Sequence, residues 1–260
     1  MSTRRAGTGT WTTTALGLAA FVTFGATVAL GLGLPDTREQ GEYSKLIAIH
    51  PPVAWAAYLA FGVTALASLL WLLPRTRARL WDLVAGASAE IGVVFTALTL
   101  ATGSIWGRPT WGSWWVWDAR LTLSALMLFL FLGYLTLRRV PADVEVRSRR
   151  SAVAALLAVL VVPINHFAVE WWRTLHQGRS LDELSPTENL DGQFVAAMLL
   201  GFLAMTLVYA WLLVHRYRVA RLEESIEGDE LSVALAERRA EGRASLADLA
   251  DESVLEGTRS

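Results

Sequence analysis

Long runs of apolar residues dominate the chain, and short polar stretches separate them. A helix of about 17–25 mostly apolar residues is long enough to cross the hydrocarbon core of a bilayer. The pattern therefore predicts an all-α integral membrane protein with six transmembrane helices. The six runs lie at residues 11–34, 46–73, 82–105, 121–137, 151–172 and 192–214.

The residues at the ends of these runs support the assignment. Pro74 closes the second run and the pair Arg138-Arg139 follows the fourth. Proline cannot continue a helix, and arginine favours the membrane surface. The first run follows Arg4 and Arg5, as a signal peptide would. It is longer than the apolar region of about 7–15 residues in a cleaved signal, so we expect a retained helix.

The distribution of Lys and Arg predicts the orientation. If the N-terminus is cytoplasmic, thirteen Lys and Arg residues fall on the inner side and six on the outer side. Cytoplasmic segments carry the excess of these residues, so we expect the N- and C-termini to be cytoplasmic. The outer segments are then residues 35–45, 106–120 and 173–191.

Composition excludes several classes of protein. Of 260 residues, 53% are hydrophobic and 18% charged, against about 25% charged in soluble domains; the main body is therefore not a soluble enzyme. The absence of cysteine excludes a disulfide scaffold, a thiolate-bound cluster and haem attached through C-x-x-C-H. We divide the chain into a transmembrane domain, 1–221, and an acidic cytoplasmic tail, 222–260, which is partly helical or disordered.

The outer segment 106–120 is unusually rich in tryptophan. It holds five of the chain's 12 tryptophans, and Trp171 and Trp172 add two on the same predicted face. An aromatic belt at the membrane interface is one interpretation, although a belt does not need five tryptophans in one loop. The other is a flat aromatic platform for a large planar ligand, with glycines that let the backbone approach it.

Two of the four histidines share that predicted face. His50 lies near the outer start of the second run, and His176 follows the fifth. Imidazole is a common axial ligand of haem iron, so the pair together with the tryptophans predicts a bis-histidine haem site. His166 lies about 9 Å inside the outer end of the fifth run, at 1.5 Å per residue. His215 is expected to be an interfacial residue.

Three stretches carry a resemblance to a known family. Residues 111–122 (WGSWWVWDARLT) resemble the WWD signature of the haem-handling proteins of cytochrome c maturation, and the WDARLT continuation resembles the CcmC family in particular. Residues 49–55 (IHPPVAW) and 170–178 (EWWRTLHQG) resemble that family's two histidine motifs. The resemblance covers about residues 45–215. Pro51 departs from the family's usual aliphatic residue, and the acidic tail is longer than usual.

The resemblance implies a function. CcmC-like proteins hold haem b non-covalently at the outer, periplasmic face of the inner (cytoplasmic) membrane and deliver it to the haem chaperone CcmE. The small membrane protein CcmD and the ABC-type subunits CcmA and CcmB are the implied partners, with no nucleic acid. This chain has no P-loop motif, so we expect a transfer subunit without its own ATPase activity rather than an enzyme.

Other functions remain alternatives. A CcsA-type haem lyase, which attaches haem to apocytochrome c, also carries a WWD motif but usually has more histidines and helices. A haem- or quinone-binding electron-transfer subunit would need histidines at mid-membrane depth. A solute permease would carry no haem.

The resemblance also assigns the site residues. His50 and His176 are the implied axial ligands of the iron. Arg108 and Arg120 either pair with the haem propionates or anchor the chain at the interface. The further haem-contacting candidates are Trp55, Trp106, Trp111, Gly112, Trp114, Trp115, Trp117, Asp118, Trp171 and Trp172.

Three further residues have supporting roles. Asp118 is expected to orient a backbone turn or a tryptophan N–H. Glu170 is expected to support His166 or His176. Glu90 lies about 12 Å from the inner end of the third run, where an ionisable residue is costly. It is protonated, paired with a polar group such as Asn165, or in contact with another subunit.

Overall fold

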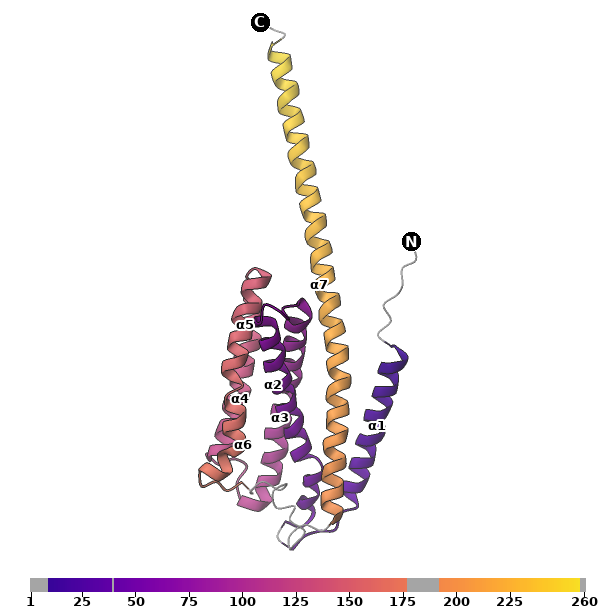
Figure 1. The fold of residues 1–260 in the computed structure, drawn as a ribbon, viewed down its shortest axis with the longest axis vertical. Coiled ribbons are helices and arrows are strands. Elements are labelled where there is room, and N and C mark those ends of the chain that lie inside the picture. Colours follow the sequence, from indigo (N-terminus) through magenta and orange to yellow (C-terminus); the bar gives the residue numbers. More distant parts are fainter. Residues whose placement is uncertain (1–8, 39, 177–191, 258–260) are drawn as a thin grey trace. The chain divides into compact units, whose positions relative to one another are not determined.

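The computed structural model describes residues 9–38, 40–176 and 192–257. Within these ranges every regular element is helical (Figure 1). Six helical segments have the length and hydropathy to cross a membrane, which confirms the predicted fold class and number of spans. The elements are α1 (Trp11–Leu32), the 3₁₀ helix η1 (Glu42–Ala48), α2 (His50–Leu72), α3 (Arg79–Trp111), α4 (Ala119–Arg139), α5 (Val144–Ala158), α6 (Val161–Trp171) and α7 (Gly192–Gly257).

The fifth apolar run forms two helices instead of one. α5 ends at Ala158 and α6 begins at Val161. Pro163 has no N–H with which to bond the carbonyl of Val159, and its ring crowds that carbonyl. The Val159 carbonyl instead accepts the N–H of Val162 at 2.9 Å. The break therefore follows from the proline, and both helices together make up one membrane span.

The predicted outer segment 106–120 is helical over its first six residues. α3 continues through Pro109 to Trp111 and ends at Gly112, which has a φ of 73°. Glycine adopts this left-handed conformation without steric cost. α4 then starts after Asp118, whose Oδ1 accepts the N–H of Leu121 at 2.8 Å. Asp118 therefore caps α4, in agreement with the expected role in a backbone turn.

Small residues let the central helices pack closely. α2 presents the buried Ala56 and Ala60 within a core that includes Phe95 of α3. A Cβ on Gly92 would lie 2.5 Å from the Phe61 ring, so this glycine admits the ring against α3. Phe61 in turn stacks on Phe131 of α4, with ring centroids 3.6 Å apart. Close approach of this kind is the main source of helix association in lipid.

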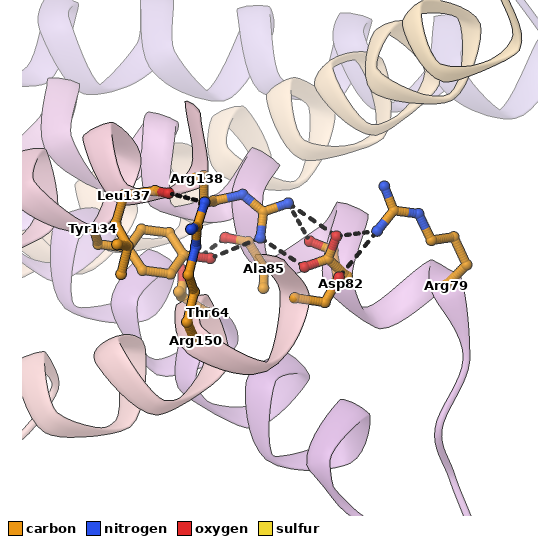
Figure 2. Close-up of polar contacts among 9 residues, drawn as sticks. Thr64, Arg79, Asp82, Ala85, Tyr134, Leu137, Arg138 and Arg150 are labelled. Atoms are coloured by element: carbon orange, nitrogen blue, oxygen red, sulfur yellow. Dashed lines mark hydrogen bonds and ion pairs between the residues drawn. The ribbon is translucent and has the colours of Figure 1, made fainter. Parts of the chain in front are cut away.

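Charged residues join α3, α4 and α5 at the start of α3. Figure 2 shows the guanidinium groups of Arg79 and Arg138 converging on the Asp82 carboxylate. Arg138 donates to Asp82 Oδ1 at 2.7 Å and to Oδ2 at 3.1 Å, and Asp82 is only 3% exposed. Arg79 also donates to the hydroxyl of Ser148 on α5 at 3.2 Å. We call Arg79, Asp82 and Arg138 the ion-pair cluster.

Glu90 has a different partner from the one considered in the sequence. Arg216 of α7 donates from Nη2 to Glu90 Oε1 at 3.0 Å, and a second bond joins Arg216 Nε to Oε2. Asn165 instead donates to the Tyr58 hydroxyl at 3.0 Å and to Ser124 Oγ at 3.1 Å. The Glu90–Asn165 pairing is therefore wrong, because the two side chains belong to separate networks.

The chain divides into two compact units, residues 1–217 and residues 218–260. In the second unit the described residues, 218–257, are helical and belong to α7. The domain boundary placed at residue 221 stays a prediction. All of the site described below lies in the first unit.

Candidate functional site

A cavity of about 300 Å³ lies among α2, α3, α4, α6, α7 and the segment that follows α6. This volume falls at the lower end of the range of about 300–1,000 Å³ typical of small-molecule sites. Its lining includes eight of the residues singled out from the sequence. They are His50, Trp55, Trp106, Trp111, Trp115, Arg120, His166 and His176.

The fold brings His50 and His176 together across this cavity. His50 is the first residue of α2, and His176 lies in the segment after α6. Their ring centroids are 6.4 Å apart, with an angle of 39° between the rings. Trp106 meets His50 edge-on at 5.6 Å, and the Trp111 ring lies 6.2 Å from that of His176. Each histidine thus has a tryptophan neighbour from α3.

Helix α3 also fixes the position of the His50 ring. Nδ1 of His50 lies 2.9 Å from the hydroxyl oxygen of Thr102. A Cβ on Gly103 would lie 2.9 Å from Cε1 of His50, so the absence of a side chain there lets the ring rest on α3. Only 8% of His50 is exposed, so its ring is buried against α3.

Polar groups also line the cavity. Arg120, in the first turn of α4, lines it and donates to the carbonyl of His166 at 3.2 Å. Tyr58, Ser124 and Asn165 also line it, joined by the hydrogen bonds described above. A guanidinium in a partly enclosed site attracts a carboxylate, so this region suits a ligand that carries acidic groups.

Sequence reasoning missed several residues of the lining. Tyr58 and Ser124 sit within apolar runs, where a polar side chain indicates a functional or packing role. That signal was available for these two and for Asn165, which was considered only as a partner of Glu90. No such signal marks Gln40, which accepts the indole N–H of Trp106 at 3.1 Å.

Other candidates lie outside the cavity lining, as far as the described residues go. Arg108 donates to the carbonyl of Gly112 at 2.6 Å, and its guanidinium lies 6.0 Å from the Trp114 ring. Together with the bond from Ser104 Oγ to the Trp114 carbonyl at 2.7 Å, this ties the loop after α3 back to the helix. Arg108 thus holds the loop in place.

The candidate tryptophans do not all line the cavity. Four of them line it and have been named above, and of these Trp55 is also exposed. The other four lie outside the described lining and are exposed: Trp114, Trp117, Trp171 and Trp172. Glu170 is also exposed, near the end of α6.

Polar atoms beside the cavity are left without hydrogen bonds. The indole Nε1 of Trp115 and Oδ2 of Asp118 are buried and have no partner among the described residues. Buried polar groups in proteins are nearly always bonded, so each exception calls for a physical explanation. Trp115 itself lines the cavity, and its indole Nε1 is buried.

Comparison with known proteins gives the same family as the three motifs. The profile of the family CcmC, heme exporter protein C, matches residues 3–232. Heme exporter protein C of Haemophilus influenzae is 37% identical over 217 residues, which cover 80% of this chain and 85% of that protein. The protein of the same name from Bradyrhizobium diazoefficiens is 39% identical over 194 residues, covering 71% and 72%.

A mitochondrial relative extends the comparison. A ccmC-like protein of Marchantia polymorpha, named for cytochrome c biosynthesis, is 37% identical over 157 residues, which cover 60% of this chain and 65% of that protein. The profile match spans most of the chain, and the six apolar helices agree with it. This multi-pass membrane protein therefore belongs to the CcmC family, the family of heme exporter protein C.

Proposed function

We propose that this protein binds haem in the cavity between His50 and His176 and passes it on during cytochrome c maturation. The observation that carries the proposal is the approach of the two imidazoles, 6.4 Å between centroids, inside a tryptophan-lined cavity. The names of the relatives, heme exporter protein C and a cytochrome c biosynthesis protein, support the same role. The chain acts as a transfer subunit and not as an enzyme.

The spacing of the two histidines fits a single metal ion between them. Two imidazoles bound to one metal from opposite sides, with metal–nitrogen bonds of about 2 Å, have ring centroids about 6 Å apart. The observed separation is 6.4 Å. Haem supplies the iron that these imidazoles would ligate, and the absence of cysteine supports non-covalent binding of haem b.

The remaining cavity residues fit the periphery of a haem. Arg120 supplies the cation for a propionate, since guanidinium and carboxylate form paired hydrogen bonds. The unpartnered N–H of Trp115 supplies a donor beside it. The rings of Trp106 and Trp111 cover apolar surface of a planar ligand. Together these residues bind and orient haem without a covalent bond, so it can leave again.

The proposal also includes the step in which haem leaves the protein. The haem is delivered to the chaperone CcmE at the periplasmic face of the inner membrane, with both termini in the cytoplasm, as the Lys and Arg count favours. The exposed tryptophans Trp114, Trp117, Trp171 and Trp172 adjoin the cavity residues in sequence and offer a rim for that partner. CcmA, CcmB and CcmD complete the ABC-type assembly and supply the nucleotide energy that this chain has no motif to use.

Absorption spectra test the proposal. The full chain, purified in detergent after coexpression with CcmE, should show the oxidised and reduced spectra of a six-coordinate bis-histidine haem. H50A and H176A should each lose the six-coordinate spectrum. The matched control is H215A, because the His215 ring packs on Trp211 of α7, away from the cavity lining.

Two results would overturn the proposal. A wild-type protein that never carries haem, with or without CcmE, would exclude haem handling. Unchanged spectra in both variants would exclude His50 and His176 as ligands. Covalent haem on coexpressed apocytochrome c, and none on CcmE, would favour the CcsA-type lyase alternative over delivery to the chaperone.

A further inference from the structure

Three residues of α3 surround the His50 ring. Thr102 lies within hydrogen-bond distance of Nδ1, Gly103 lies under Cε1, and Trp106 meets the ring edge-on. Thr102 and Trp106, at positions i and i+4, share one face of the helix, and Gly103 lies beside them. One side of α3 therefore determines how the ring is turned, and the polar contact determines which ring nitrogen carries the proton.

The other hydrogen bonds of Thr102 favour one direction for that contact. Its hydroxyl donates to the carbonyl of Leu98 at 2.8 Å, with the carbonyl of Thr99 also near, at 3.2 Å. A hydroxyl has one proton to donate and lone pairs with which to accept. When that proton is directed to a helix carbonyl, the Thr102 oxygen accepts from His50. His50 then carries its proton on Nδ1 and keeps the lone pair on Nε2.

We propose that Thr102 is a positioning residue that presents Nε2 of His50 as a ligand for the haem iron. The inference rests on the proposed function. A histidine that binds metal through one nitrogen must carry its proton on the other, and that N–H needs an acceptor. In the buried setting of His50, Thr102 Oγ1 is the acceptor, and Gly103 leaves the space that the ring needs to reach it.

The geometry holds the His50 ring firmly. Thr102, Gly103 and Trp106 of α3 restrain it. Removing the acceptor would leave the Nδ1–H unsatisfied in the ligated state and would let the ring turn. Removing the hydroxyl should therefore lower haem affinity more than the stability of the fold, because only haem binding requires the proton on Nδ1.

Haem titration of Thr102 variants tests this inference. The full chain in detergent is titrated with ferric haem, and the Soret spectrum, the dissociation constant and the reduction potential are recorded. T102V has nearly the same shape without the hydroxyl, and it should weaken haem binding about 10–100-fold, as loss of such a partner typically does. T102S, which restores the hydroxyl, should restore affinity, spectrum and potential.

The matched control is T136V. Thr136 makes the same bond to the carbonyl four residues before it, at 2.9 Å, on the exposed side of α4. That variant should leave all three readouts unchanged. G103A gives a second route that does not depend on the hydroxyl, because its Cβ would displace the His50 ring. It should change the spectrum as T102V does.

The outcomes separate this inference from the proposed function. If the wild type binds no haem, the proposed function fails. If the wild type binds haem and H50A loses the six-coordinate spectrum, but T102V keeps wild-type affinity, spectrum and potential, only the role of Thr102 is overturned. If T102V does not yield folded protein, T102A takes its place, because it also removes the hydroxyl. Weaker haem binding by T102A, with wild-type behaviour of T102S, supports the role, and wild-type affinity, spectrum and potential in T102A overturn it.

Discussion

At the start of α3, Asp82 is buried and two arginines bond its carboxylate. Beyond the other end of the same helix, Trp115 Nε1 and Asp118 Oδ2 are buried and meet no partner in the described parts of the chain. The first arrangement joins α3 to α4 through ion pairs and α3 to α5 through the Ser148 hydroxyl. The second lies beside a cavity, and there two polar atoms have no hydrogen-bond partner among the described residues.

This difference distinguishes the ion-pair cluster, which stabilises the fold, from the cavity, which is the proposed haem site. Removing one member of a buried ion pair leaves an uncompensated charge, and the free energy of unfolding falls. A buried donor without a partner costs free energy already in the ligand-free protein, and that cost is recovered when a ligand accepts from it. Substitutions at the ion-pair cluster should therefore change stability, and substitutions at the cavity should change haem affinity.

The largest expected effect is at the ion-pair cluster. D82N should lower the free energy of unfolding by about 3–5 kcal/mol, because it leaves Arg138 buried without its counter-charge. Denaturant unfolding in detergent, followed by tryptophan fluorescence, measures the change. The folded fraction should bind haem with wild-type affinity.

The matched control for D82N is D36N. Asp36 pairs with Lys45 at 3.1 Å, but its side chain is 54% exposed. The same substitution should cost only about 0–1 kcal/mol there. Equal losses at the two sites would show that burial of the ion-pair cluster does not determine its contribution, and the contrast between the two ends of α3 would fail.

Arg120 should give the next largest effect, and it should appear in binding. R120Q removes the cation from the cavity and should weaken haem binding about 10–100-fold, as expected for the loss of about 1.4–2.8 kcal/mol. Its bond to the carbonyl of His166 contributes separately to stability, by about 1.5–3 kcal/mol for a hydrogen bond from a charged group. Titration with haem and with haem dimethyl ester separates the two contributions.

The ester has no carboxylates, so it should bind wild type and R120Q equally. A variant that loses affinity for the ester as strongly as for haem would show that Arg120 acts by shaping the cavity and does not contact a propionate.

The smallest expected effect is a difference in stability between variants of Trp106 and Trp115, two tryptophans that line the cavity. W106F removes the N–H that donates to Gln40 and should cost about 1 kcal/mol of stability. W115F removes an N–H that has no acceptor among the described residues, so it should leave stability unchanged or raise it slightly. Haem affinity should fall for W115F, since the ligand then loses a donor. Thermal unfolding and haem titration of both variants check the comparison, and a stability loss for W115F as large as that for W106F would contradict it.

Local features of the fold could be predicted from the sequence. The six spans follow from runs of apolar residues, and Asp118 caps α4 as its place in the motif suggested. The position of the break in the fifth span is also encoded locally by Pro163, although the sequence analysis expected one helix there. The continuation of α3 to Trp111 was missed because the tryptophan-rich segment was interpreted as a loop.

The contacts between helices could not be predicted in the same way. Arg216 rather than Asn165 is the partner of Glu90, and Thr102, which no sequence pattern had marked, lies beside His50. In a membrane the lipid is as apolar as the protein interior, so an apolar pattern does not show which side of a helix meets which neighbour. A polar residue in a span marks a place where a partner is needed without naming it.

The sequence by itself determined that this chain crosses the membrane six times and that its tryptophans and two histidines belong to one family's motifs. Length and hydropathy are properties of each segment alone, so whether a segment can span the membrane does not depend on tertiary contacts. Only the tertiary structure decided that His50 and His176 face each other at 6.4 Å, that α3 holds one of them by a hydroxyl, and that the tryptophans divide between a cavity and its surroundings. These arrangements depend on packing between segments far apart in the chain, where small residues such as Gly103 set how closely two helices approach.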